Sequence, residues 1–408
     1  MTVKKLFDPE PLGYAQMSLF ILIELLLIFD KTFSKFHLFG PFYLYDFLLI
    51  LLTLFSGIKI VKNRTKLLYW PILVLVGVST LYLFYSYFIL HSPVNYSVRQ
   101  FAVIVYIATV YIIFLSFINT ETLKFNIRFL ILLGIAAFAL QLAYHVYNFI
   151  FHDNFIGSLF NEFNYFSEMA FMALFLFEVY ILVYISKWWK LLFIFLFLLL
   201  ISTLGHQGSA IIVSSLVLGL YFVLQVDLYK KYILLLAGIA CIYGMFAFFP
   251  QYFLDHNSMW RYIYWKITLK DIFEHYYGIL GHGFGVQFTT PEVLETMSKD
   301  INSPWFEVRP EEKYLTPMHN SFITIAYHIG FVFMLLIFIP LKNMFTYIFK
   351  RSSENSSKEK NFLTLSMFAV MGWASFHVIL ELPHSSALFW LIYFSTAYLF
   401  SNNKNGVI

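Results

Sequence analysis

Long apolar segments recur along almost the whole chain, and no other feature restricts its fold as strongly. A membrane-spanning helix needs about 20 predominantly apolar residues. Only 12% of the residues are charged, whereas a soluble domain has about 25%. The sequence therefore predicts an all-α polytopic membrane protein with about 12 transmembrane helices. The twelve expected segments lie near 14–30, 38–58, 67–90, 98–118, 126–151, 163–185, 189–204, 209–225, 231–250, 320–341, 362–380 and 385–401.

A long polar interruption divides these segments into two groups. We expect transmembrane helices 1–9 in 1–250, a large loop in 251–318 and helices 10–12 in 319–408, with a polar cytoplasmic loop near 342–361. Within the large loop, apolar residues recur at helical spacing, which predicts a short helix lying on the outer surface. The residues of this stripe are Trp260, Ile263, Tyr264 and Ile267.

Lysine and arginine alternate from loop to loop, and this alternation predicts the orientation of the chain. Positively charged short loops stay in the cytoplasm, and long loops are left out of the count. Of the 27 lysines and arginines, only Lys31, Lys35 and Arg99 fall in short loops on one side. That side is therefore expected to face outward, together with the 251–318 loop, and both termini are expected in the cytoplasm.

The histidines gather on the same expected outer side. All 12 except His328 fall in outer loops or at outer helix ends, and His328 is expected near the middle of the 320–341 helix. Histidine exchanges protons near neutral pH. The outer side is therefore the expected chemical side of the protein.

His319 and Asn320 follow Pro317 directly before the tenth apolar segment. A proline before a polar residue is typical of a helix start, so we expect His319 at the membrane boundary beside a helix N-terminus. A helix N-terminus disfavours a positive charge and lowers the pKa of a histidine. A neutral imidazole is suited to act as a general base. The alternative reading is a polar residue that only caps the helix.

Three arginines of the expected outer side are candidate ligands for phosphate, because the guanidinium group binds phosphate through two hydrogen bonds. Arg261 lies on the expected surface helix, Arg99 begins the fourth apolar segment, and Arg309 lies in the large loop. The alternative for Arg261 and Arg99 is an ordinary contact with lipid headgroups.

A glycine-rich stretch, Gly281-His282-Gly283-Phe284-Gly285, is a candidate anion-binding turn, because successive backbone N–H groups can face an anion. A flexible turn is the alternative. No metal-binding spacing, phosphate-binding loop with its lysine, or basic patch for nucleic acid is present in the sequence. No cofactor is therefore expected.

The order of these motifs resembles that of the O-antigen polymerase and ligase superfamily. The resemblance rests on Arg261 and Trp265, the glycines at 281, 283 and 285, and His319-Asn320-Ser321 followed by Gly330. It covers roughly 261–330. It implies a helical bundle of the kind found in lipid-linked-sugar glycosyltransferases (GT-C-like), in the inner membrane of a bacterium, with an active site facing the periplasm.

The resemblance implies transfer of a glycan from an undecaprenyl-pyrophosphate carrier to an acceptor hydroxyl, without a metal or a nucleotide sugar. His319 would be the base for the hydroxyl, Arg261 would hold pyrophosphate, and Asn320 would be one of the residues that bind the substrate. Many members carry Ser-Arg-Gly-Ala after the seventh helix, where this chain has His206-Gln207-Gly208-Ser209. His206, Gln207 or Arg99 would then replace the missing arginine.

Three functions remain open at this stage. The first is a polymerase that joins lipid-linked repeat units into O-antigen or a similar polysaccharide, and it allows a chain-length regulator as a partner. The second is a ligase that moves finished glycan to lipid A core or to protein. The third is a transporter for lipid-linked sugars, which would require ionisable residues along the bundle interior; here they crowd the outer face, which favours an enzyme.

Overall fold

The protein is helical throughout the part of the chain that the structure describes. This computed structural model describes residues 37–39, 42–63, 69–117, 120–151, 168–185, 187–204, 208–226, 230–233, 236, 256–288, 290–291, 293, 295–296, 312–314, 316–349 and 357–401. Two short antiparallel strands, β1 (His37–Phe39) and β2 (Phe42–Tyr43), are the exception within these ranges.

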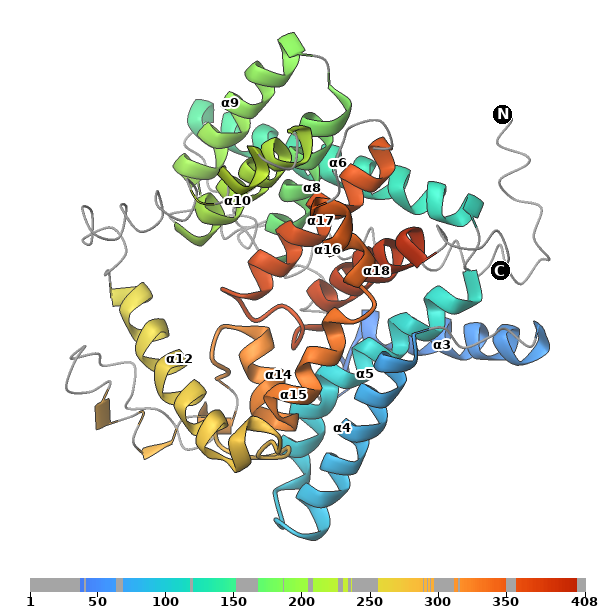
Figure 1. Cartoon of the computed structure of the whole chain (residues 1–408), viewed down its shortest axis with the longest axis vertical. Helices are drawn as coiled ribbons and strands as arrows, with labels where there is room; N and C mark the ends of the chain where they lie inside the picture. The colour runs from blue at the N-terminus through green and yellow to red at the C-terminus, as the bar shows by residue number, and fades with distance from the viewer. Residues whose placement is uncertain are drawn as a thin grey trace.

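Figure 1 shows how the described α-helices are arranged, and most of the long ones coincide with apolar segments of the sequence. In chain order they are α3 (Leu44–Asn63), α4 (Trp70–Phe88), α5 (Val94–Phe117), α6 (Thr120–Phe151), α8 (Glu168–Tyr184), α9 (Lys187–Leu204), α10 (Gly208–Gln225), α12 (His256–Glu274), α14 (Ser321–Ile329), α15 (Phe331–Met334), α16 (Lys342–Phe349), α17 (Lys358–Ala374) and α18 (Pro383–Ser401). Three short 3₁₀ helices are η3 (Tyr276–Gly278), η5 (Glu312–Tyr314) and η6 (Leu335–Phe338).

Within the described residues, four helices are long and apolar enough to cross a membrane, and a fifth span is added if the bent pair 331–338 and 342–349 is counted as one. The exposed surface of α4 suits lipid, because Leu81, Phe84 and Phe88 remain exposed on it. The expected segment 14–30 and most of 231–250 lie outside the described residues. The count of about 12 spans therefore stays a prediction, while the membrane-helical class is supported.

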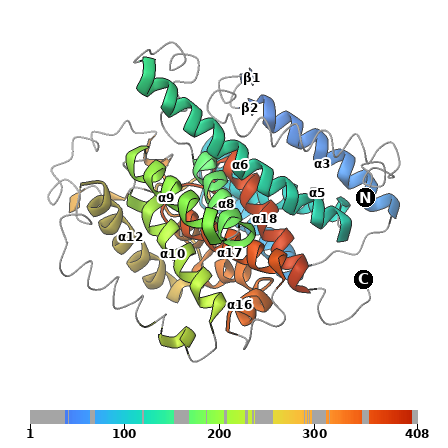
Figure 2. The ribbon, with the colours of Figure 1, turned by 90° about the horizontal axis from the view of Figure 1, so that it is seen from above.

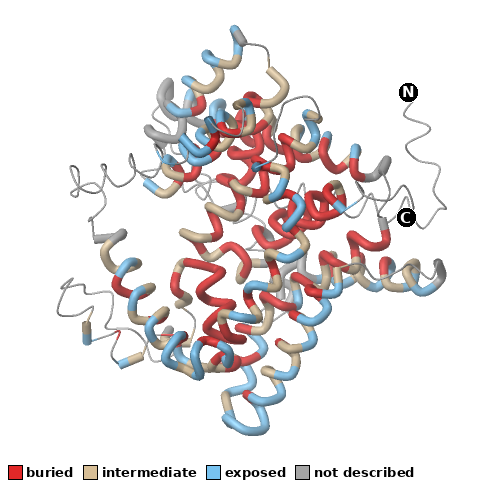
Figure 3. Tube along the Cα trace, in the orientation of Figure 1, coloured by how far each residue is buried: buried red, intermediate tan, exposed pale blue. Residues whose placement is uncertain are grey.

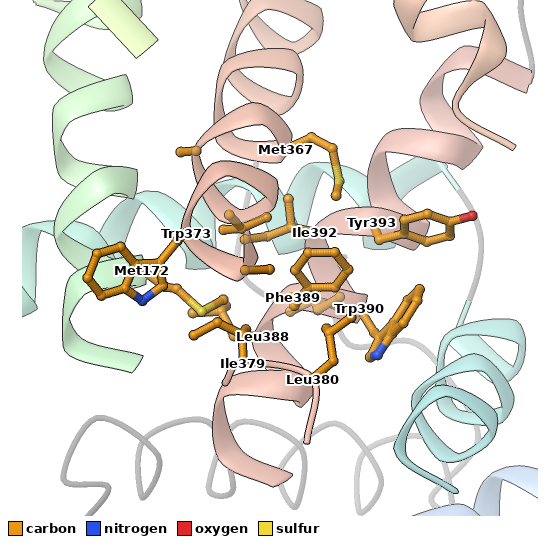
Figure 4. Packing of buried hydrophobic residues seen from close by; sticks show 14 of the residues in the cluster. Met172, Met367, Trp373, Ile379, Leu380, Leu388, Phe389, Trp390, Ile392 and Tyr393 are labelled. Carbon is orange, nitrogen blue, oxygen red and sulfur yellow. The ribbon is translucent and has the colours of Figure 1, made fainter. Parts of the chain in front are cut away.

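The core lies where α8, α17 and α18 meet, with α5, α6 and α10 packed around them. Figure 3 shows buried residues concentrated in this central part of the molecule, and Figure 2 shows α3 alongside α5. Trp373 of α17 and Trp390 of α18 are fully buried. Figure 4 shows Ile379 and Leu380, from the loop between α17 and α18, lying in the same packed cluster. Their burial fixes this loop to the core.

The prediction of one continuous helix over 320–341 is wrong. The chain breaks at Gly330, whose φ is 91°, and α14 is a separate helix whose nine residues are all buried. The expectation failed because hydropathy reports burial and not backbone direction. Correspondingly, His328 lies in the last turn of α14 and not in the middle of a span.

The segment expected as a polar loop over 342–361 begins with a helix, α16. Met344 and Ile348 of this helix are buried, and the Lys231 Nζ donates to the Ile348 carbonyl at 2.7 Å. The linker interpretation is therefore wrong for 342–349, because spaced apolar residues give this stretch a face that packs against the bundle.

Two glycines allow the backbone of 278–281 to lie directly against the end of α14. An added Cβ at Gly281 would lie 2.2 Å from the His328 carbonyl oxygen, and one at Gly330 would lie 2.2 Å from the Ile279 carbonyl oxygen. Both ends of α14 therefore contact loops that the charge pattern assigns to the outer side, since Ser321 at the other end binds residues 377–381.

Replacing Gly330 by alanine is expected to lower the free energy of unfolding by about 3 kcal/mol. Overpacking costs about 1–3 kcal/mol, and a side chain in this backbone region costs about as much again. The measurement is thermal unfolding of the detergent-purified protein. Gly77→Ala in α4 is the control, because nothing lies within 4 Å of its added Cβ. Equal stability of Gly330→Ala and the wild type would contradict this packing.

Candidate functional site

The segment before α14 is held against α12 by two hydrogen bonds. The indole N–H of Trp265 donates to the Met318 carbonyl at 2.6 Å, and the Tyr264 hydroxyl donates to the Thr316 carbonyl at 3.1 Å. The expected apolar stripe therefore faces the rest of the protein, with Tyr264 buried. Trp260 of the same stripe contacts the His319 ring in a T-shaped arrangement, at a centroid distance of 5.0 Å.

Asn320 caps α14 and also binds the loop after α17. Its Oδ1 accepts from the backbone N–H groups of Phe322 and Ile323, both at 3.1 Å. Its Nδ2 donates to the Ser375 carbonyl at 2.8 Å. The predicted helix start is confirmed, and Asn320 acts within the fold as a cap and an anchor. The φ of 50° at His319 turns the backbone just before this cap.

Ser321 fixes the loop that carries His377. Its Oγ donates to Glu381 Oε2 at 2.5 Å and accepts from the backbone N–H groups of Ile379 and Leu380 at 2.9 and 3.0 Å. The His377 carbonyl lies 3.2 Å from the same hydroxyl. One buried side chain therefore sets the position of the loop relative to His319.

His377 lies at the meeting point of three helices. Its Nε2 lies 2.9 Å from Ser209 Oγ at the start of α10, and its ring stacks on Trp373 of α17 at 3.7 Å. The positive charge of Arg261 on α12 acts on both His319 and His377. We call Arg261, His319, His377 and Ser209 the central cluster. Its members are far apart in sequence. Arg261 comes from α12, Ser209 from α10, His377 from the loop after α17 and His319 from the segment before α14.

The two imidazoles of the central cluster are neutral at pH 7. Burial, and secondarily the Arg261 guanidinium, lower the pKa of His319 to about 4. The same causes, with His319 added, hold the pKa of His377 well below its usual range. The pKa of His319 is lowered as expected, but its causes are burial and Arg261 rather than the helix N-terminus. The cluster thus combines one permanent cation with two neutral proton acceptors.

A second group of side chains lies at the other end of α14, about 13 Å from His319 along the helix axis. His282 Nε2 lies 3.0 Å from Asp271 Oδ2, and the His282 ring lies between those of His275 and Tyr327, at 4.4 and 4.2 Å. The hydrogen bond from His282 holds the pKa of Asp271 below its usual range. Burial lowers the pKa of His275.

The backbone N–H groups of the glycine-rich stretch are already used within the fold. Those of Gly281, His282, Gly283, Phe284 and Gly285 all donate to protein acceptors. The acceptors are the Tyr82 hydroxyl, the Tyr327 and His328 carbonyls, Ser86 Oγ and Gln100 Oε1, at 2.6–3.0 Å. The stretch packs α4, α5 and α14 together. Its predicted role in anion binding is untested, and we leave it out of the proposed site.

Arg99 lies on α5, a helix that contributes no residue to the central cluster. Arg99 is exposed on α5, beside Gln100, whose amide binds Gly285 N–H at 2.6 Å and the Val286 carbonyl at 2.8 Å. His206, Gln207 and Arg309 lie outside the described residues. Their predicted roles remain predictions.

Sequence reasoning did not single out His377 or Ser209. The available signal was the gathering of histidines on the expected outer side, but it did not rank them. Within the described part of the chain, no group of three or more histidine, cysteine or acidic side chains could hold a metal ion.

No family model, curated protein or solved structure matches the chain. The class of protein therefore follows from the fold itself: apolar helices long enough to span a membrane define an α-helical membrane protein. The central cluster gives this membrane protein its candidate chemistry.

Proposed function

We propose that this membrane protein is a glycosyltransferase that polymerises undecaprenyl-pyrophosphate-linked oligosaccharide repeat units at the periplasmic face. The observation that carries the proposal is the convergence of Arg261, His319 and His377 from separate segments. A transfer with a pyrophosphate leaving group needs a cation for the phosphates, a base for the hydroxyl and a fixed orientation. The central cluster offers all three.

In the proposed reaction, His319 accepts the proton of the acceptor hydroxyl. The freed oxygen forms a bond to the anomeric carbon of the donor glycan. The bond between that carbon and the pyrophosphate oxygen breaks, and its electron pair stays on the leaving undecaprenyl pyrophosphate. Arg261 stabilises the negative charge that grows on this group.

The arrangement of the helix ends supports a single chemical face. The loop after α17 and the start of α10 meet at His377, and the 91–100 region meets 281–286. The charge pattern assigned these segments to the outer side independently of their contacts. This grouping agrees with a protein of the inner membrane whose termini both lie in the cytoplasm and whose active site faces the periplasm.

The proposal is tested by mixing the purified protein with an undecaprenyl-pyrophosphate oligosaccharide. A ladder of product sizes at multiples of the repeat unit is expected. Transfer only to added lipid A core or protein would instead identify a ligase. Absence of any product, together with movement of the lipid-linked sugar across vesicles, would identify a transporter and end the proposal.

EDTA is expected to leave the yield of this ladder unchanged, because the proposed mechanism stabilises charge with arginine and histidine. The measurement compares yields before and after chelation. A loss of product that a divalent cation restores would require a revised mechanism.

A further inference from the structure

The charges of the central cluster do not balance those of the substrate in the proposed reaction. A sugar–pyrophosphate–lipid carries about two negative charges, and a third develops as the glycosidic bond breaks. The described side chains of the cluster carry one permanent positive charge, on Arg261. A further positive charge is therefore needed when substrate binds, and most of all in the transition state.

We propose that His377 is the second cation of the pyrophosphate site: it is neutral in the free protein and takes up a proton when pyrophosphate binds. This inference rests on the proposed function and adds to it the identity of the second charge. His377 is fixed by Ser209 and by the Trp373 ring. Its loop lies against the segment that carries His319, because the His377 carbonyl lies 3.2 Å from Ser321 Oγ and Asn320 Nδ2 donates to the Ser375 carbonyl at 2.8 Å.

The groups around His377 come from several described elements. α12 contributes Arg261, the segment before α14 contributes His319, and α10 and α17 contribute the uncharged Ser209 and Trp373. On its own loop, the Glu381 carboxyl is bound by Ser321, and burial raises its pKa. Arg261 and burial thus oppose a charge on His377, and an added anion removes part of that opposition.

A titratable second cation suits this position better than a permanent one. An arginine at 377 would place a second fixed charge in a buried site beside Arg261 while no substrate is present, and unpaired buried charge is destabilising. Histidine avoids this cost in the free protein. It supplies the charge only when pyrophosphate is present to stabilise it.

The test is calorimetric binding of farnesyl pyrophosphate, a short prenyl pyrophosphate, to the full-length protein in detergent at several pH values. Measurements in two buffers of different ionisation enthalpy count the protons taken up. The wild type is expected to take up about one proton on binding, in addition to any protons that the ligand itself takes up or releases. Its affinity is expected to fall by up to about tenfold per pH unit above neutrality.

His377→Gln is expected to bind at least about tenfold more weakly and to lose the extra proton uptake. His377→Arg is expected to bind without this uptake, with an affinity that stays nearly constant between pH 6 and 8.5. His282→Gln, in the second group, is the matched control and should retain the wild-type uptake. Thermal unfolding checks that each variant is folded.

Unchanged proton uptake in folded His377→Gln would overturn the inference while leaving the proposed function intact. Wild-type protein that binds no prenyl pyrophosphate and forms no product ladder would instead overturn the proposed function. The two failures are therefore separate observations. If His377→Arg does not fold, the comparison of His377→Gln with the wild type still decides the question.

Discussion

Replacing His319 by alanine is expected to reduce glycan transfer by about 10²- to 10⁴-fold, the usual contribution of a general base. The imidazole is neutral at pH 7, since burial and Arg261 lower its pKa to about 4. A base with so low a pKa binds protons weakly in the free protein. In the proposed reaction, the negative charge of bound pyrophosphate would raise that pKa, so proton transfer would be favoured only after the donor had bound.

The measurement is the initial rate of ladder formation by the purified variant. His282→Ala is the matched control, because it removes an imidazole from the second group at the far end of α14. It should keep its transfer rate within a few-fold of the wild type if it remains folded. Full activity of His319→Ala would end the mechanism proposed here.

Replacing Arg261 by glutamine is expected to reduce kcat/KM by about 10²- to 10³-fold, the cost of removing one group that stabilises developing charge. Arg261→Lys should recover only part of this loss, because lysine keeps the charge but not the planar pair of donors. The guanidinium lies 5.7 Å from the centre of the Trp260 ring, and the same ring contacts the His319 ring at a centroid distance of 5.0 Å. The kinetic constants of the three proteins provide the measurement.

Arg99→Gln is the control for this series. Arg99 was a sequence candidate for the second phosphate ligand, but it is exposed on α5, which contributes no residue to the central cluster. Its removal is expected to change kcat/KM by less than about twofold. A large loss in Arg99→Gln with little loss in Arg261→Gln would move the pyrophosphate site away from the central cluster.

The sequence was informative about helices because a span must be long and apolar, and these properties can be read directly. The start of α14 was also readable, because Pro317 and Asn320 mark it locally. The break at Gly330 was not readable. A glycine inside an apolar run does not reveal that the Ile279 carbonyl lies too close for any Cβ.

The candidate site was predicted in part for a similar reason. Arg261 and His319 stand out as polar residues at the edges of apolar or aromatic stretches. His377 depends on contacts between distant segments: Ser321 holds its loop, and Ser209 comes from α10. Hydrogen bonds across more than 50 residues of sequence leave no local pattern, so no reading of one segment could have paired these groups.

Helices α12 and α14 are held together by contacts at both ends. At one end the Trp265 indole holds the Met318 carbonyl, and at the other Asp271 lies against His282, whose own backbone N–H is bound to Tyr327 of α14. The two helices cannot separate at either end without breaking one of these contacts. In the proposed reaction, a lipid-linked substrate would therefore have to reach Arg261 without any separation of α12 from α14.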